Sequence, residues 1–324
     1  MTKKERILCA MNGKPVDRVP VSFYTHLQSR EDNLVPRNVN WVKDTGMDMI
    51  CIEPDGYYSL LSEHPLRTIE DWKRFRPYSK DHPFIERQVD RASRVAEALQ
   101  DDAAVYYMAF TPFAFFRNTV GGGQTLCMEY WNTARDEMQE ILKVLEESNF
   151  NLLEELKKTG IDGLFVSMQH AETWRFTRED YLKYMAPYDH RLIDYVNANF
   201  KNNIGHLCSW ETNTTNSRIN FDLYQDYAFQ TMNWGIYQRD SMTMAEGKQY
   251  FTRSKAVMGG FDRNPEGVLY SGNEEEIKAF TKNLIQETGS EGFILSADCS
   301  IVVDTPEEHI RWVVEAAEEF AQGK

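Results

Sequence analysis

The pattern of hydrophobic and polar residues predicts short strands that alternate with longer helices. Eight short runs are rich in β-branched or aromatic residues, as buried strands are. They cover residues 18–24, 48–53, 104–110, 163–167, 203–208, 228–233, 256–260 and 292–296. Strands that alternate with helices along a chain are typical of a parallel sheet covered by helices.

The clearest helical segments between these strands repeat apolar residues at the i, i+3, i+4 spacing. They cover residues 134–158, 178–199, 274–288 and 306–321. Two of them carry start signals. Thr177 stands before the acidic pair Glu179 and Asp180, and Thr305 is expected to be an N-cap with Pro306 in the first helical position.

Eight strand-then-helix units match the count of a closed (β/α)8 barrel (TIM barrel), and 324 residues lie within the usual size of that fold. We therefore expect one α/β barrel domain over residues 1–324. A doubly wound sheet is the alternative. It is disfavoured because no G-x-G-x-x-G follows the first predicted strand, and the glycines at 121–123 come only after the third.

Composition narrows the classes of partner. The formal net charge of −14 makes nucleic acid an unlikely ligand, because basic residues are outnumbered. No run approaches the ~20 apolar residues that a membrane helix needs. The five cysteines are odd in number and widely spaced, so a disulfide framework is not expected and a reducing cytoplasm fits best.

Barrel enzymes carry their sites at the carboxyl ends of the strands, which makes the residues there candidates. Glu53 and Glu172 are predicted to act as proton acceptors or to complete a metal site. The predicted substrate-binding residues are Tyr24, His26, Trp234 and Asp262. For the acidic residues the alternative is structural, because a carboxylate after a strand often caps the next helix.

His206 and Cys208 are the most suggestive pair. Residues i and i+2 at the end of a strand point to the same side, and barrel closure would bring Cys299 to the same rim. One imidazole and two thiolates suit zinc in a site that keeps a fourth position open. On spacing alone the packing explanation is favoured, since no tight C-x-x-C pair is present and buried cysteines are common.

Several segments together resemble the uroporphyrinogen decarboxylase superfamily, whose members are single (β/α)8 barrels. The segments are ERI at 5–7, DRVP at 17–20, FTREDY at 176–181, APY at 186–188, MGGFD at 258–262 and DTPE at 304–307. The resemblance extends over nearly the whole chain and implies the same fold.

Two positions favour the zinc-dependent, corrinoid-linked methyltransferase branch over the decarboxylases. Decarboxylases carry an arginine-rich stretch after the first strand, where this chain has YTHLQSR at 24–30 with Arg30 as the one basic residue. Such methyltransferases carry H-x-C-G after the fifth strand and G-C-G after the eighth. This chain has GHLC at 205–208 and DCS at 298–300, with Ser209, Asp298 and Ser300 in place of glycines.

The resemblance implies that His206, Cys208 and Cys299 bind Zn²⁺. It also implies that a methyl group is exchanged between a corrinoid (methylcobalamin) on a separate carrier protein and a thiol or related small molecule, in either direction. A tetrapyrrole decarboxylase and a non-catalytic barrel that binds a corrinoid or porphyrin are the alternatives. Whether the chain forms a homodimer is left open by the sequence.

Overall fold

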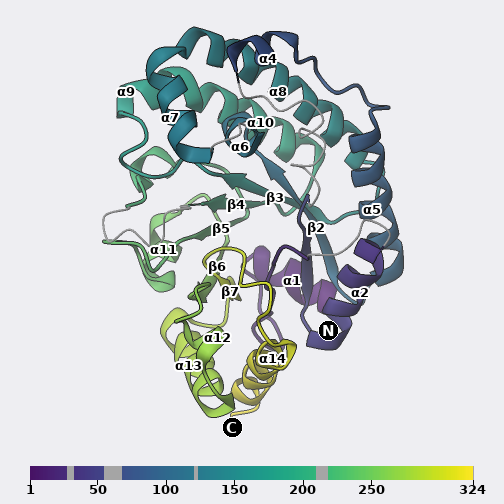
Figure 1. Cartoon of the computed structure of the whole chain (residues 1–324). Coiled ribbons are helices and arrows are strands. Elements are labelled where there is room, and N and C mark those ends of the chain that lie inside the picture. Colours follow the sequence, from purple (N-terminus) through teal and green to yellow (C-terminus); the bar gives the residue numbers. More distant parts are fainter. Residues whose placement is uncertain (28–32, 55–67, 120–122, 209–217, 324) are drawn as a thin grey trace.

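The computed structural model describes residues 1–27, 33–54, 68–119, 123–208 and 218–323. Its centre is one parallel sheet of seven strands that are paired in chain order (Figure 1). The strands are β1 Met49–Ile52, β2 Ala104–Phe110, β3 Gly163–Met168, β4 Ile204–Leu207, β5 Thr231–Trp234, β6 Ala256–Phe261 and β7 Phe293–Ala297. Seven of the eight predicted strands are thereby confirmed. Every residue of these seven strands is buried, as expected where helices cover a parallel sheet.

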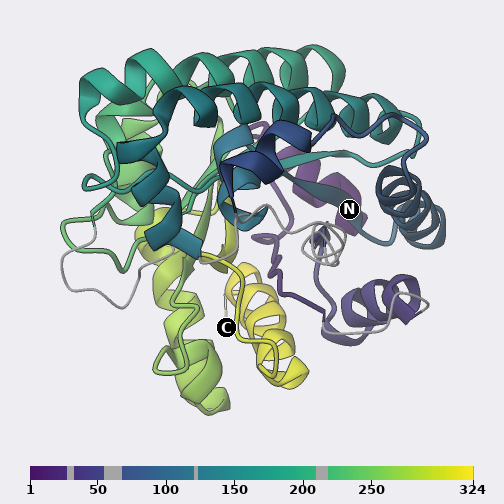
Figure 2. The same cartoon turned by 45° about the horizontal axis from the view of Figure 1, so that its top comes forward.

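Helices precede, connect and follow the strands, and their bounds are as follows. They are α1 Lys3–Met11, α2 Leu34–Thr45, α4 Ile69–Arg74, α5 Pro83–Leu99, α6 Pro112–Thr119, α7 Gly123–Thr133, α8 Arg135–Leu156, α9 Arg178–Asp180, η2 Tyr181–Met185, α10 Ala186–Asn199, η3 Phe221–Leu223, α11 Met244–Tyr250, α12 Val268–Ser271, α13 Glu274–Thr288 and α14 Glu307–Ala321. In the outer layer α14 packs on α2, α2 on α5 and α5 on α8. Figure 2 shows α13 and α14 side by side near the C-terminus.

The first predicted strand, 18–24, is not a regular strand, and this is a correction. The segment lies between β7 and β1: Ser22 N–H donates to the carbonyl of Leu295 (2.9 Å), and Asp48 N–H donates to that of Val21 (2.8 Å). However, only one isolated bridge, between Val21 and Leu295, is formed. The ladder is interrupted because Pro20 has no N–H and because Val21 N–H is taken by the Asp48 side chain at 2.8 Å.

Asp48 holds this segment to the edge of the sheet and to α1. Its fully buried carboxylate pairs with Arg6 Nη1 at 2.6 Å and with Arg18 Nη1 at 2.7 Å. Arg6 belongs to α1, which contacts β1, β2, β6 and β7. Since Asp48 directly precedes β1, the network lies at the amino ends of the strands, opposite the predicted site.

The predicted helices are confirmed, with two local differences. Residues 178–199 form α9, a π-helical turn η2 and α10 instead of one regular helix. Pro187 explains the change, because it lacks the N–H of a regular helix interior and its ring crowds the preceding turn. Thr177 caps α9 as expected, whereas Pro306 is the N-cap of α14 and the Thr305 hydroxyl donates to Val302.

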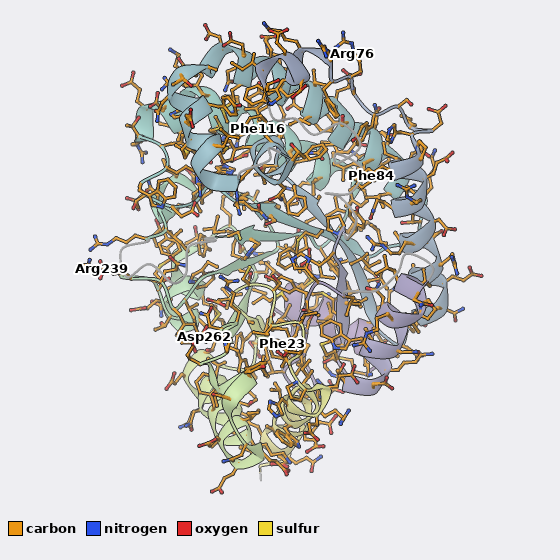
Figure 3. The ribbon with its side chains drawn as sticks, in the orientation of Figure 1. Phe23, Arg76, Phe84, Phe116, Arg239 and Asp262 are labelled. Atoms are coloured by element: carbon orange, nitrogen blue, oxygen red, sulfur yellow. The ribbon has the colours of Figure 1, made fainter. Side chains whose placement is uncertain are left out.

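The aromatic side chains supply much of the core. Phe23 and Phe116 lie inside the ribbon, while Arg239 extends from its edge (Figure 3). Within the described part of the chain, no helix has the length and apolarity to cross a membrane. All five cysteines are free in the structure.

Asp48→Asn is expected to lower the free energy of unfolding by about 3 to 5 kcal/mol, because two buried guanidinium groups lose the carboxylate that they share. Urea denaturation followed by circular dichroism measures the change. Asp17→Asn is the matched control: Asp17 also binds Arg6, but its side chain is 44% exposed. The control should lose less than about 1 kcal/mol. Equal losses would contradict the role given to Asp48.

Candidate metal centre

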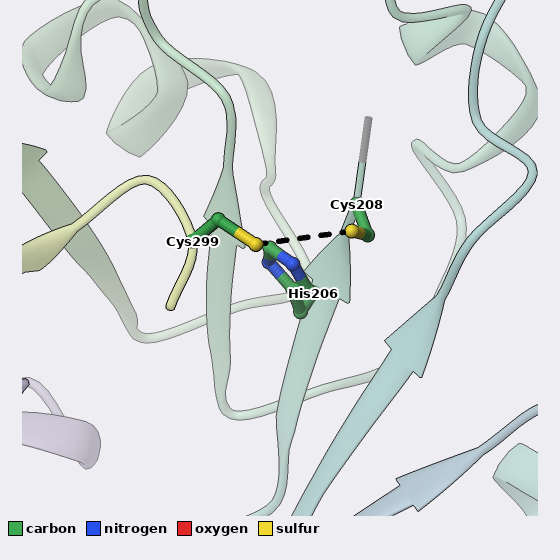
Figure 4. A group of neighbouring side chains, drawn as sticks. All are labelled: His206, Cys208 and Cys299. Carbon is green, nitrogen blue, oxygen red and sulfur yellow. Dashed lines mark hydrogen bonds between the residues drawn. The ribbon is translucent and has the colours of Figure 1, made fainter. Parts of the chain in front are cut away.

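Three side chains meet at the carboxyl ends of β4 and β7. The ligand atoms of His206, Cys208 and Cys299 all lie within 4.8 Å of one another, and all three residues are buried. The two sulfurs are 3.9 Å apart although the residues are 91 positions apart in the chain. Figure 4 shows His206 and Cys208 at the end of β4, with Cys299 approaching from the loop after β7. The structure thus brings the three predicted metal ligands together.

The backbone fixes the two ligands of β4. His206 is paired in register with Ser167 of β3 and Asn233 of β5. Cys208 N–H donates to the carbonyl of Met168 at 3.1 Å, which continues the ladder one residue beyond the strand. His206 and Cys208 therefore point to the same side of the sheet, as the i, i+2 spacing predicts.

The two thiols differ in acidity. The hydrogen bond from Cys208 holds the pKa of the Cys299 thiol well below its ordinary value, with help from His206 and from the charge of Arg263, although burial opposes it. The same hydrogen bond, together with burial, raises the pKa of Cys208 well above the ordinary value. The two shifts are opposite in direction, so Cys299 loses its proton more easily than Cys208. Thiolates are the form in which cysteine binds metal ions.

Charged groups from helix α6 and from the loops after β6 and β7 surround this pair. Burial lowers the pKa of Arg117, and the charge of Cys208 acts in the opposite direction. Burial also lowers the pKa of Arg263, but the charges of Cys299 and Asp298 raise it overall. Burial raises the pKa of Asp298 to about 8, with a further contribution from Cys299. The two guanidinium groups offset negative charge on the sulfurs.

Tyr24 lies beneath the three ligands. Its ring stands edge-on to His206, with 6.2 Å between the ring centroids, and its hydroxyl donates to Asn233 Oδ1 at 3.4 Å. Burial, with added charge from Cys299, Cys208 and Glu53, raises its pKa well above the ordinary value. Tyr24 therefore stays a neutral phenol beside the ligands.

Glu53 and His26 lie at neighbouring strand ends. Glu53 is buried directly after β1, and its backbone carbonyl accepts from Arg91 at 2.6 Å. His26 is half-buried and follows Thr25, whose hydroxyl donates to the carbonyl of Ile301 at 2.9 Å. Since Ile301 is two residues from Cys299, His26 belongs to the stretch of chain beside the loop that carries that ligand.

Glu172 forms a buried ion pair. Its carboxylate accepts two bonds from the guanidinium of Arg175, both at 2.9 Å, and neither side chain is exposed. Among the residues that the structure describes, the group of ligand atoms within 4.8 Å includes neither Glu172 nor Glu53. The charge of Glu172 nevertheless acts on Cys208, so the pair lies near the centre.

Trp234 and Asp262 have structural contacts. The indole N–H of Trp234 donates to the carbonyl of Met242 at 3.0 Å, and its ring packs against Gly247 of α11. Trp234 thus lies on the helix side of the sheet, away from the three ligands. Asp262 is half-buried and accepts from the backbone N–H of Asn264 at 2.9 Å, which closes the turn after β6.

Sequence reasoning missed Asn233, Arg263 and Arg117. Asn233 could have been found by alternation along β5, because it is level with His206 and Trp234 then faces the other way. Arg263 directly follows a candidate residue. Arg117, on α6, carries no local signal. The predicted Arg30, Ser209 and the glycines at 121 and 122 lie outside the described residues.

Gly205→Ala is expected to disturb the centre from within β4. A Cβ at residue 205 would lie 2.3 Å from the buried ring of Phe229. Overpacking of this kind costs about 1 to 3 kcal/mol and moves backbone. We expect lower stability in urea and weaker metal uptake. The double variant with Phe229→Leu should be less destabilised than the sum of the single variants. Simple additivity would contradict this steric account.

Comparisons with known proteins agree with this fold. The profile of the uroporphyrinogen decarboxylase (URO-D) family matches residues 42–320. Methylcobamide:CoM methyltransferase MtbA from Methanosarcina mazei is 22% identical over 355 aligned positions, which cover 98% of each protein. A solved structure of a methyltransferase from Methanosarcina mazei covers 99% of each chain with a TM-score of 0.74 at 16% identity.

A second solved structure is also similar in fold, but it superposes less closely on this chain. It is a B12-independent methionine synthase from Shewanella sp. W3-18-1 in complex with selenomethionine, with a TM-score of 0.56 and 12% identity over 95% of each chain. At these identities both structural likenesses concern the fold alone. The family profile, which spans most of the chain, shows that this protein belongs to the uroporphyrinogen decarboxylase family.

Proposed function

We propose that the protein is a zinc-dependent methyltransferase. It exchanges a methyl group between a corrinoid (methylcobalamin) on a separate carrier protein and a thiol or related small molecule. The observation that carries the proposal is the convergence of His206, Cys208 and Cys299 within 4.8 Å. The similarity to methylcobamide:CoM methyltransferase over 98% of the chain supports the reaction class.

The donor set fits zinc. Two sulfurs and one imidazole are the ligands that this ion prefers, and three protein ligands leave one position for a substrate. Within the described part of the chain, His206 Nδ1 is buried without a hydrogen-bond partner. A buried polar atom in this state is costly unless it binds a ligand. When bound here, zinc would keep a thiol in its nucleophilic thiolate form at neutral pH.

Residues of the chain prepare this site. Cys299 already has a lowered pKa, so less work is needed to form the thiolate that binds the metal. Arg263 and Arg117 stabilise negative charge on the two sulfurs. Tyr24 and Asn233 are neutral, buried and hydrogen-bonded to each other, and they exclude water from the side of the ligands that faces the inside of the sheet.

The remaining predicted residues lie around Tyr24 and Asn233. Glu53 completes the ligand set in the resting state, while His26 and Asp262 border the substrate. Glu172 keeps Arg175 in place through their buried ion pair. Trp234 is not included in the proposed site, because its contacts are those of a packing residue.

In this proposal the segment 18–24 occupies the position of the eighth strand, so that the whole chain is a single (β/α)8 barrel domain. Its support is the pair of backbone bonds to Leu295 and Asp48, on either side. Free thiols at the centre require a reducing compartment, for which the cytoplasm is our proposal.

Protein purified without chelator is expected to contain about one zinc ion per chain. Three N and S ligands are the usual protein ligands of a catalytic zinc site, in which the fourth position is open. Elemental analysis should find little zinc in Cys208→Ser and Cys299→Ser. Cys9→Ser is the matched control, since Cys9 is in α1 at the opposite end of the sheet. Zinc near zero in the wild type, or unchanged in Cys299→Ser, would count against the proposal.

The reaction is tested with methylcobalamin and a panel of thiols. The wild type should demethylate methylcobalamin, seen as a change in its visible spectrum, and Cys299→Ser should be slower by at least about 100-fold. Spectra that stay constant with every thiol would favour a non-catalytic binding protein. Release of carbon dioxide from uroporphyrinogen instead would favour the decarboxylase alternative.

A further inference from the structure

A buried polar cluster lies beside the metal centre and has no part in it. One oxygen of Asp189, Oδ2, is bonded to His170 Nε2 at 2.9 Å, to the hydroxyl of Tyr181 at 2.9 Å and to that of Tyr227 at 3.1 Å. The side chain of His170 is 0% exposed and that of Asp189 is 2% exposed. The cluster joins the end of β3 to η2 and α10.

The hydrogen bonds determine which nitrogen of His170 carries the proton. A carboxylate can only accept, so Nε2–H donates to Asp189 and Nδ1 keeps its lone pair in the neutral ring. This Nδ1 atom is buried and has no hydrogen-bond partner among the residues that the structure describes. An imidazole oriented by a carboxylate, with its other nitrogen available, is the arrangement of a positioned general base.

The tyrosines act as fixed donors in this cluster. Burial, with the charge of Asp189 as the next cause, raises the pKa values of Tyr181, Tyr224 and Tyr227 well above the ordinary value, so the three stay protonated. Tyr181 is the first residue of the π-helical turn, a rare conformation that is frequent at functional sites. The turn is thus held to His170 through Asp189.

His170 lies close in the fold to the metal ligands. It follows Met168 by two residues, and Met168 is the residue whose carbonyl accepts from Cys208 N–H. Arg117 donates to the carbonyl of Gln169 at 3.1 Å, and the charge of Cys208 acts on Arg117. Gln169 Oε1 is also buried and finds no partner in the described ranges, so two neighbouring residues at this strand end offer polar atoms for a ligand.

We propose that His170 is the proton acceptor for the thiol substrate and that Asp189 is its positioning residue. The inference rests on the function proposed above. The S–H bond of the thiol breaks, its electron pair stays on sulfur, and the proton passes to His170 Nδ1 directly or over one water. The carboxylate of Asp189 stabilises the imidazolium that forms. In the reverse direction His170 returns the proton to the leaving thiolate.

Other charged groups near His170 do not replace it. Besides Asp189 and the three tyrosines, the ion pair of Glu172 and Arg175 lies near His170, because the Arg175 guanidinium lies over Phe113, whose ring is edge-on to His170. The two bonds to Arg175 engage both oxygens of Glu172.

Calorimetry counts the proton directly. Zinc-loaded protein is titrated with 2-mercaptoethanol at pH 7 in two buffers of different ionisation enthalpy, which gives the number of protons released per thiol bound. Free thiols are mostly protonated at this pH, so a site without a base should release about one proton. We expect that value for His170→Gln and a clearly smaller value for the wild type. The number of protons released by Asp189→Asn should be larger than in the wild type and closer to that of His170→Gln.

Tyr224→Phe is the matched control, because it removes a buried hydroxyl that donates to the backbone carbonyl of His170 at 3.3 Å but leaves the Nε2 bond intact. It should lower the melting temperature and keep the proton count of the wild type. Zinc content is measured for every variant. Equal proton counts in wild type and His170→Gln, with zinc and binding retained, would overturn the inference alone. If zinc-loaded wild type binds no thiol of the panel, the proposed function fails and the inference with it.

Discussion

The three metal ligands meet because the parallel sheet is curled. Cys208 and Cys299 are 91 positions apart, and their sulfurs come within 3.9 Å because the sheet bends until β7 reaches the segment that precedes β1. Asp48 maintains this closure from the amino ends of the strands, where its carboxylate satisfies Arg6, Arg18 and a backbone N–H that a flat sheet edge would leave open. Stability and chemistry are therefore separated at the two ends of the strands.

Burial gives the site its electrostatic character. Two thiols taken out of water cannot both ionise easily, and the hydrogen bond between them favours ionisation of Cys299 by lowering its pKa. Arg117 comes from helix α6 and Arg263 from the loop after β6, yet both act on the sulfurs. The neighbouring cluster around Asp189 uses the same principle, because one carboxylate oxygen with three donors fixes the orientation of His170.

Much of this could be predicted from sequence, because strands and helices follow from local periodicity. The i, i+2 spacing of His206 and Cys208 and the topology of a barrel allowed Cys299 to reach them, but the shared metal site became the favoured interpretation only through the family resemblance. Features that depend on one atom of a distant residue could not be predicted. The Asp48 carboxylate takes a ladder bond from Val21, which interrupts the expected first strand. Asp189 reaches His170 from a helix later in the chain, and no local pattern encodes that contact.

The central claim is that one nitrogen and two sulfurs of this chain bind a single zinc ion. Zinc K-edge X-ray absorption on the purified protein tests it most directly. We expect two sulfur neighbours at about 2.3 Å and a nitrogen neighbour at about 2.0 Å, with one further sulfur after a thiol is added. A first shell of oxygen and nitrogen alone, unchanged by thiol, would contradict the account.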